Sequence, residues 1–259
     1  MKRILFYSAL LACIIYGCKS SKKVSQAGIY QLQKQMVSGG GKDTVYARTQ
    51  IKIYTNDHFI YAGMAPDSSV GFGVGSYKTD TGNTIIENST YSSRTLDSPQ
   101  VFHLKINATD SGYTQVIPNI ATVKAVKYDF KEIYRRIPAT DTSALDGLWK
   151  LDTAYTVKGK DTVKAKETQF KVFWGGHFMF VHRYPLDGTG TKFKNGFGYG
   201  DFSLKSDTLS EEDAITSHAA LLNHKFAIKI SFKGSDEYSQ VINDEKTKEQ
   251  SVEIYRRVK

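Results

Sequence analysis

The sequence predicts an all-β protein built as two tandem up-and-down antiparallel β-barrels, with about eight strands in each. Two observations carry this prediction. The same series of motifs occurs twice, and apolar residues alternate with polar ones in short segments that turn residues separate. The composition agrees, because 40% hydrophobic and 24% charged residues are usual for a globular protein and exclude disorder and fibrous repeats.

Residues 1–17 predict a secretory signal peptide. Two cationic residues follow the first methionine, and residues 4–17 then form an apolar run of 14 residues without charge. This run is too short for a transmembrane helix, which needs about 20 residues. Its end, Gly17-Cys18, resembles the lipobox of bacterial lipoproteins, in which a small residue precedes a cysteine that is diacylated before the signal is cut.

The lipobox resemblance implies a lipid anchor on Cys18. Cys13 lies inside the apolar run, so Cys18 would be the only cysteine of the mature chain and no intramolecular disulfide could form. Residues 18–27 would then be a polar, lipidated tether, and we expect the protein in the cell envelope, on the periplasmic or surface side of the outer membrane. The alternative is an ordinary signal peptide or an uncleaved anchor, with Cys18 incidental.

A tandem duplication organises the rest of the chain. Seven blocks recur in the same order, with an offset that varies only between 118 and 125 residues. They define two units, 28–137 and 147–259, joined by a linker at 138–146. The blocks are 28–32 with 147–151, 42–45 with 160–163, 49–54 with 168–173, 58–61 with 177–180, 71–77 with 196–202, 113–117 with 238–242 and 132–136 with 253–257.

Each unit reads as β-structure along its whole length. Segment 211–222 has a helix-like pattern, but it aligns with a strand of the first unit, so we expect a strand or a loop carrying one helical turn. Eight sequential antiparallel strands can close on themselves and leave no exposed edges. In the first unit we expect strands near 28–37, 43–54, 58–63, 70–78, 83–91, 100–107, 113–118 and 129–137.

Glycines recur at every second position of one strand in each unit, which places them all on one face. We expect them to let the strand coil sharply or let another backbone come close. They do not form a phosphate-binding loop, because the G-x-G-x-x-G spacing and a following helix are both missing. The glycines are Gly71, Gly73 and Gly75 in the first unit and Gly196, Gly198 and Gly200 in the second.

The start of the second unit, Gly147-Leu148-Trp149, resembles the G-x-W signature of lipocalins and their calycin relatives. The order of the motifs in both units is also similar to that of bacterial lipocalin-like domains. This resemblance implies a small ligand-binding barrel with no defined reaction. It further implies that an arginine near the end of the last strand covers the first aromatic ring. The pairs would be Arg256 or Arg257 with Trp149, and Arg135 or Arg136 with Tyr30.

Histidine and glutamate residues recur at matching places in both units and are the first candidates for a binding site. His58 would meet Glu87, and His177 would meet Glu211, either as polar groups of a pocket or as structural pairs that fix two strands. Aromatic residues could line the barrel interior or its mouth, or fill the core. The aromatic candidates are Tyr61 and Tyr77 in the first unit and Phe180 and Phe202 in the second.

Other function classes find little support in the sequence. The net charge of +9 includes five cationic residues and no acidic one within the first 27 residues, so we expect no nucleic-acid partner. No nucleophile motif such as G-x-S-x-G occurs, although two acids could still converge for glycoside hydrolysis. His177 and His182 would face opposite sides of a strand. We therefore predict no enzyme, no bound metal and no cofactor.

Two functional hypotheses follow. The first is a lipid-anchored envelope protein whose barrels bind or carry a small, mostly apolar ligand. The second is an accessory or scaffolding lipoprotein with filled barrels, whose surface binds another envelope protein or a glycan. An open cavity with convergent polar groups would favour the first hypothesis, and a void-free interior would favour the second.

Overall fold

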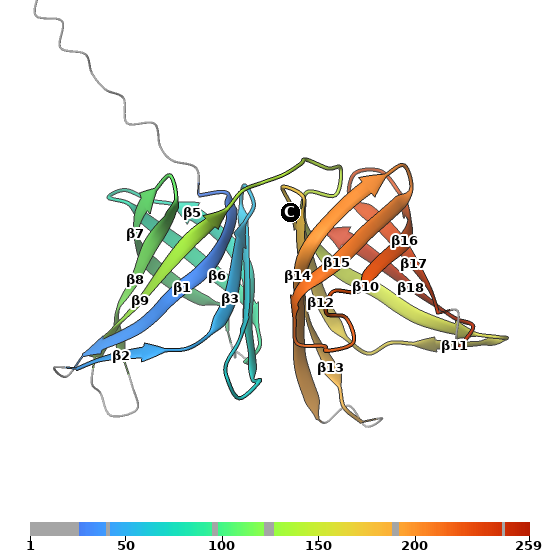
Figure 1. Ribbon diagram of the computed structural model, residues 1–259, viewed down its shortest axis with the longest axis horizontal. Helices are drawn as coiled ribbons and strands as arrows, with labels where there is room; N and C mark the ends of the chain where they lie inside the picture. The colour runs from blue at the N-terminus through green and yellow to red at the C-terminus, as the bar shows by residue number, and fades with distance from the viewer. Residues whose placement is uncertain (1–25, 40–41, 95–97, 122–126, 188–191, 245–246) are drawn as a thin grey trace, which may run out of the picture.

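The computed structural model describes residues 26–259, apart from 40–41, 95–97, 122–126, 188–191 and 245–246 (Figure 1). It confirms the predicted fold class, with two closed eight-stranded antiparallel barrels and one extra strand on each. Over the described ranges the secondary structure is entirely β, so no apolar helix of membrane-spanning length is present there. Cys18 and the predicted signal peptide lie outside the described residues.

Barrel 1 closes because β1 pairs with β3 along one edge and with β9 along the other. The predicted strand 43–54 is in fact two strands. The part β2 (Lys42–Tyr46) pairs only with the far end of β1 and projects beyond the barrel wall. The barrel strands are β1 (Gly28–Gly39), β3 (Thr49–Tyr54), β4 (His58–Met64), β5 (Val70–Thr79), β6 (Thr84–Ser92), β7 (Gln100–Thr109), β8 (Gly112–Ala121) and β9 (Lys127–Ile137).

Barrel 2 repeats this topology, with β10 closing onto β12 and β18 and with β11 (Asp161–Lys164) as its extra strand. Segment 211–222 continues the strand β15 as far as Thr216 and then forms turns, as the repeat alignment predicted. The barrel strands are β10 (Gly147–Lys158), β12 (Thr168–Trp174), β13 (His177–Pro185), β14 (Phe193–Lys205), β15 (Thr208–Thr216), β16 (Lys225–Phe232), β17 (Glu237–Asp244) and β18 (Glu249–Arg257).

Inward-facing aromatic residues fill one end of each barrel, and an arginine closes it. The Arg257 guanidinium lies 4.1 Å from the Trp149 ring centroid, and that of Arg136 lies 5.8 Å from Tyr30. The second arginine of each predicted pair therefore faces inward, because strand alternation turns the preceding one outward. The aromatic residues are Tyr30, Tyr54, Phe59, Tyr113 and Tyr134 in barrel 1, and Trp149, Phe173, Phe178, Tyr238 and Tyr255 in barrel 2.

The last glycine of each glycine-rich strand allows two backbones to touch. A Cβ on Gly75 would lie 1.9 Å from the Asn88 carbonyl oxygen, and one on Gly200 would lie 1.8 Å from that of Glu212. Both sites coincide with a register shift between β5 and β6 or between β14 and β15. A side chain cannot fit at either position, which confirms the predicted close backbone approach.

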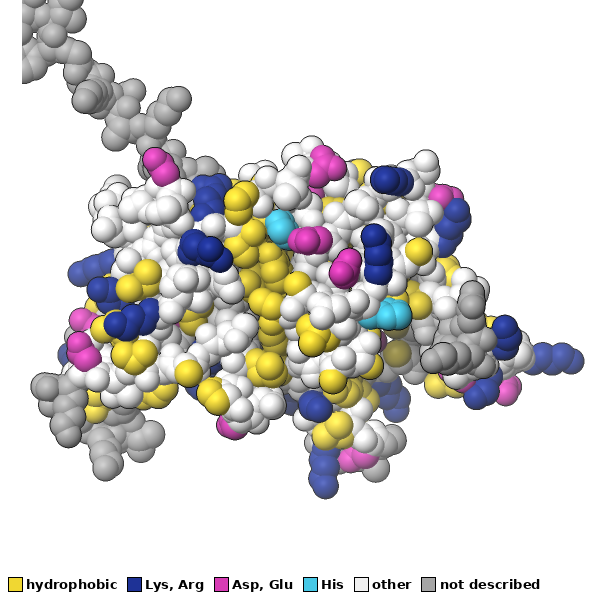
Figure 2. Space-filling model, viewed as in Figure 1, with side chains coloured by type: hydrophobic (Ala, Val, Ile, Leu, Met, Phe, Trp, Pro, Cys, Tyr) yellow, Lys and Arg dark blue, Asp and Glu magenta, His cyan; other side chains and the backbone are white. Residues whose placement is uncertain are grey.

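The two barrels share a third hydrophobic core on their outer walls. Outward residues of β1, β3, β4 and β5 pack against the matching residues of β10, β12, β13 and β14, and Figure 2 shows hydrophobic side chains gathered between the barrels. The Tyr91 and Phe170 rings meet across this interface at 5.1 Å. Strands such as β3 are therefore buried on both faces. The core residues are Ile29, Ile51, Ile53, Ile60, Ala62, Phe72 and Val74 from barrel 1, and Leu148, Phe170, Val172, Met179, Val181, Phe197 and Tyr199 from barrel 2.

Candidate functional site

Each barrel contains a cavity at the end opposite its aromatic core. The cavity volumes are about 460 Å³ in barrel 1 and about 420 Å³ in barrel 2. The lining residues come from the strand ends next to the β4–β5 and β13–β14 turns, on the side of the molecule away from the linker (Figure 1). Both cavities therefore open in the same direction.

A buried lysine–glutamate pair lies inside each cavity at the same position of the repeat. The Nζ atom of Lys52 lies 2.6 Å from a carboxylate oxygen of Glu87, and that of Lys171 lies 2.6 Å from one of Glu211. The lysines come from β3 and β12, where alternation turns them inward while their apolar neighbours face the other barrel. All four side chains are buried, and each charge is compensated by its partner.

A second buried glutamate in each cavity is held by amides and a tyrosine. In barrel 1, Gln115 donates to Glu132 at 2.5 Å and Tyr134 donates at 2.9 Å. In barrel 2, Gln240 donates to Glu253 at 2.8 Å, and burial raises the pKa of the Glu253 carboxyl. Because these side chains recur in both units, the duplication has preserved one polar arrangement inside both barrels.

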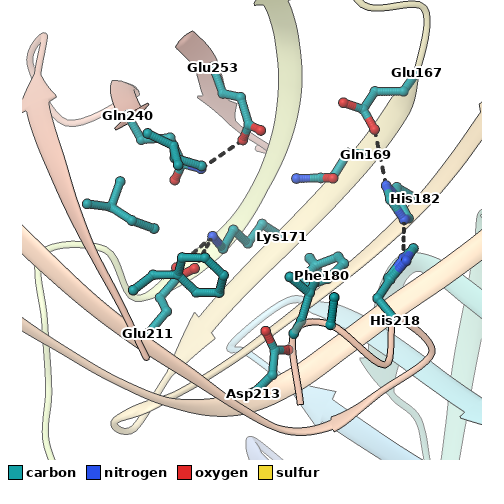
Figure 3. Close-up of a pocket in the computed structure, with 15 residues that line it drawn as sticks. Glu167, Gln169, Lys171, Phe180, His182, Glu211, Asp213, His218, Gln240 and Glu253 are labelled. Atoms are coloured by element: carbon teal, nitrogen blue, oxygen red, sulfur yellow. Dashed lines mark hydrogen bonds and ion pairs between the residues drawn. The ribbon is translucent and has the colours of Figure 1, made fainter. Parts of the chain in front are cut away.

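The walls of the two cavities carry opposite charge. Arg48 of barrel 1 is matched in the repeat by Glu167 of barrel 2, and Arg94 is matched by His218. Figure 3 shows Glu167, His182 and His218 in a row along one wall of the second cavity. His182 Nδ1 lies 3.1 Å from Glu167, and its Nε2 lies 2.8 Å from Nε2 of His218. Within the described ranges, no group of three or more histidine, cysteine, aspartate or glutamate side chains is placed to hold a metal ion.

Asp213 is the most unusual group in the second cavity. It is 3% exposed, and its Oδ1 atom has no hydrogen-bond partner among the described residues. Burial, with the neighbouring Glu211 charge, raises the pKa of Asp213 to about 7, while Lys171 acts in the opposite direction. The matching residue of barrel 1 is Ser89, since Gly75 pairs with Ser89 as Gly200 pairs with Asp213.

The predicted histidine–glutamate pairs do not form. His58 and His177 lie on the outer face of their strands, because the phenylalanine that follows each one faces inward. Their Nδ1 atoms lie 2.7 Å from Asp57 and Asp201 instead. The prediction that these histidines meet Glu87 and Glu211 is therefore wrong, both for a polar pocket and for a structural pair.

The other predicted site residues lie inside the barrels but in two different places. Glu87 and Tyr61 line the first cavity, and Glu211 and Phe180 line the second. Tyr77 packs at the aromatic end of barrel 1, where its hydroxyl donates to the Thr55 carbonyl at 2.8 Å. Phe202 belongs to the corresponding core of barrel 2. These two aromatic residues lie in the closed ends of the barrels.

Sequence analysis missed the cavity lysines, glutamines and Asp213. A signal for the first two was present, because Gln50-x-Lys52 recurs as Gln169-x-Lys171 with the same alternation, so both residues fall on one face of the strand. A lysine beside strand residues such as Ile51 usually faces solvent. Asp213 has no repeat partner of its own kind, so repetition gives no signal for it.

No family model matches the chain, and no curated protein matches it. Among solved structures, it is similar over 90% of its length to a protein of unknown function from the DUF3598 family of Nostoc punctiforme PCC 73102, covering 97% of that chain with 9% identity and a TM-score of 0.28. It is also similar over 84% of its length to a mutant of the vaccine antigen Transferrin Binding Protein B from Haemophilus parasuis Hp5, covering 55% of that chain with 12% identity and a TM-score of 0.25.

Proposed function

We propose that the protein binds or carries small, mostly apolar ligands, one in each barrel. The observation that carries this proposal is the pair of open cavities, about 460 Å³ and about 420 Å³, with a buried lysine–glutamate pair at the same place in both. Small-molecule sites are typically of this size and combine apolar walls with a few convergent polar groups. The apolar body of the ligand would contact the wall, and its polar group would reach the buried polar residues.

Apolar side chains on the walls suit such a ligand. Phe102 and Ile117 line the first cavity, and Phe226 and Ile242 occupy the matching positions in the second. The inward glycines of β5 and β14 add no side-chain volume of their own, and the space over Gly73 and Gly198 holds the ring of a cavity-lining aromatic residue. The scaffolding hypothesis requires filled barrels, so the cavities favour the binding hypothesis over it.

Native mass spectrometry tests this proposal. The full chain is exposed to an envelope extract, and we expect a reproducible mass increment that is lost on denaturation. Ile117→Trp and Ile242→Trp place a bulky ring in one cavity each, so each variant should lose part of the increment and the double variant all of it. Val101→Trp, at a position 57% exposed, is the matched control. An unliganded mass across several extracts would refute the proposal.

We also propose that a lipid on Cys18 holds the protein at the envelope, in the outer membrane. The first described residues are bound to the closed end of barrel 1, where Tyr30 donates to the Gln26 carbonyl at 3.0 Å. A tether that joins the barrel there leaves the strand ends that line both cavities on the opposite side of the molecule (Figure 1). Cys18→Ser should release the protein from membranes, and unchanged membrane retention would contradict lipidation.

A further inference from the structure

We propose that the cavity of barrel 2 selects ligands that carry a positively charged nitrogen, such as a protonated amine, on an apolar body. This inference rests on the proposed function, and it assigns a ligand class to one of the two cavities. Three features carry it: the excess of carboxylates in this cavity, an acceptor atom without a donor, and a matched cavity in barrel 1 that lacks both.

The charges of the lining residues differ between the barrels. Of the described residues that line the second cavity, four are carboxylates and only Lys171 is a permanent cation. In the first cavity three cations face two carboxylates. Lys171 is already paired with Glu211, at 2.6 Å and 2.8 Å from its two oxygens. Apart from this one shared lysine, which also acts on Asp213 and Glu253, no lysine or arginine among the lining residues compensates the remaining carboxylates, Asp213, Glu253 and Glu167.

Asp213 supplies the acceptor that a ligand would use. The residue is 3% exposed and lines the cavity, and its Oδ1 atom is buried without a hydrogen-bond donor among the described residues. Figure 3 shows this carboxylate directed toward the space between Lys171 and Phe180. A buried acceptor without a donor is costly, and a charged N–H donor from a ligand would remove that cost.

Neighbouring groups favour a cationic donor over a neutral one. The side-chain oxygen Oε1 of Gln240 is likewise buried without a donor. The Phe180 and Phe226 rings line the same cavity, and aromatic faces attract cations. Burial first, and then the Glu211 charge, raise the pKa of Asp213, and a bound cation would stabilise its ionised carboxylate. The free acceptors, the charge and the aromatic walls therefore point to one ligand class.

Barrel 1 provides a natural comparison. Ser89 stands where Asp213 stands in barrel 2, and it is buried to a similar degree at 4% exposure. Arg48 stands in place of Glu167. The single change Asp213→Ser therefore gives the second cavity the residue that the first already tolerates, and removes a buried charge without adding bulk. We expect this variant to fold.

Calorimetric titration with three matched probes tests the inference. The probes are 4-phenylbutylamine, 4-phenylbutanol and 4-phenylbutyrate, which share one apolar body and differ in the charge of the head. The site of barrel 2 is identified as the one whose binding is lost in Ile242→Trp. In the wild-type full chain at pH 8, this site should bind the amine about tenfold more tightly than the alcohol, because a charge-assisted hydrogen bond is added. Asp213→Ser and Asp213→Asn should abolish that preference, whereas Asp161→Ser on the exposed strand β11 should leave it unchanged.

The outcomes separate this inference from the proposed function. If the alcohol or the butyrate binds at this site as tightly as the amine, or if the Asp213 variants keep the amine preference, the charge selection is refuted while the cavity still binds ligands. If none of the three probes binds, the inference is overturned for this ligand class, and an unliganded mass in the envelope-extract experiment would overturn the proposed function as well.

Discussion

Replacing Asp213 by asparagine should stabilise the unliganded protein at neutral and alkaline pH. The folded protein raises the pKa of this carboxyl to about 7, against an unfolded value of about 3.8. A group whose pKa is raised on folding contributes stability in full below its unfolded pKa, and that contribution is lost as the pH rises to its folded pKa. Asparagine has nearly the same shape and never ionises, so the variant should lack this loss.

The size of the effect follows from the shift. About three pKa units, at about 1.4 kcal/mol each, correspond to about 4 kcal/mol over the whole titration, of which about 2.5 kcal/mol falls between pH 5 and pH 8. The charged or titratable groups lining the same cavity are Lys171 from β12, His182 from β13, Glu211 from β15, Glu253 from β18, and Glu167 and His218 from the mouth. These groups are present in both proteins, so the difference between variant and wild type isolates Asp213.

The assay is urea denaturation at several pH values, followed by tryptophan fluorescence. Both tryptophans of the chain, Trp149 and Trp174, belong to barrel 2, so the signal reports on the barrel that contains the substitution. The stability gain of Asp213→Asn over wild type should grow by about 2.5 kcal/mol from pH 5 to pH 8. Ser89→Asn, the matched change in barrel 1, should show no such growth. Parallel pH profiles for wild type and Asp213→Asn would refute the reasoning.

Three further predictions use the same denaturation assay. Arg257→Ala should lower the free energy of unfolding by about 2 kcal/mol, because the side chain donates to three backbone carbonyls and covers an aromatic ring. Arg256→Ala, at an exposed position, should lower it by less than about 1 kcal/mol, and equal losses would contradict this prediction. Gly200→Ala should lower the free energy of unfolding by about 3 kcal/mol, because its Cβ would strike the backbone of β15. Gly71→Ala should lower it far less, because only the end of a flexible arginine is in the way. Lys171→Met should cost about 3 kcal/mol at pH 8, and the loss should shrink in acid as the abandoned carboxylate protonates; a loss independent of pH would argue against a buried ion pair.

The repeat and the strand alternation predict most of this architecture. They give the two units, the linker, and the strand order, because hydrophobic periodicity is a local property of the chain. The division of 43–54 into two strands could not be predicted, since it depends on where β1 leaves the barrel wall to pair with β2. The shared core between the barrels was also missed, because a run such as Ile51-x-Ile53 gives no sign of which surface will cover it.

The candidate site was predicted only in part, and alternation explains the main error. Phe59 and Tyr61 face inward, which places His58 on the outside, whereas the recurrence of His58 with Glu87 had indicated a pocket or a structural pair. Glu87 was found because it recurs. Asp213 was not found, because its raised pKa and its unpaired acceptor arise from burial beside Glu211. That burial exists only once the barrel has closed.

The core between the barrels bears on how such a molecule can arise. Each of its seven positions in barrel 1 has its repeat counterpart on the other side, so the surface is complementary to a copy of itself, as in a two-fold symmetric pair of subunits. A one-barrel ancestor with this face would have existed as a homodimer with two identical cavities. Fusing the genes through a short linker would have freed those cavities from symmetry, so that one can hold arginine where the other holds glutamate.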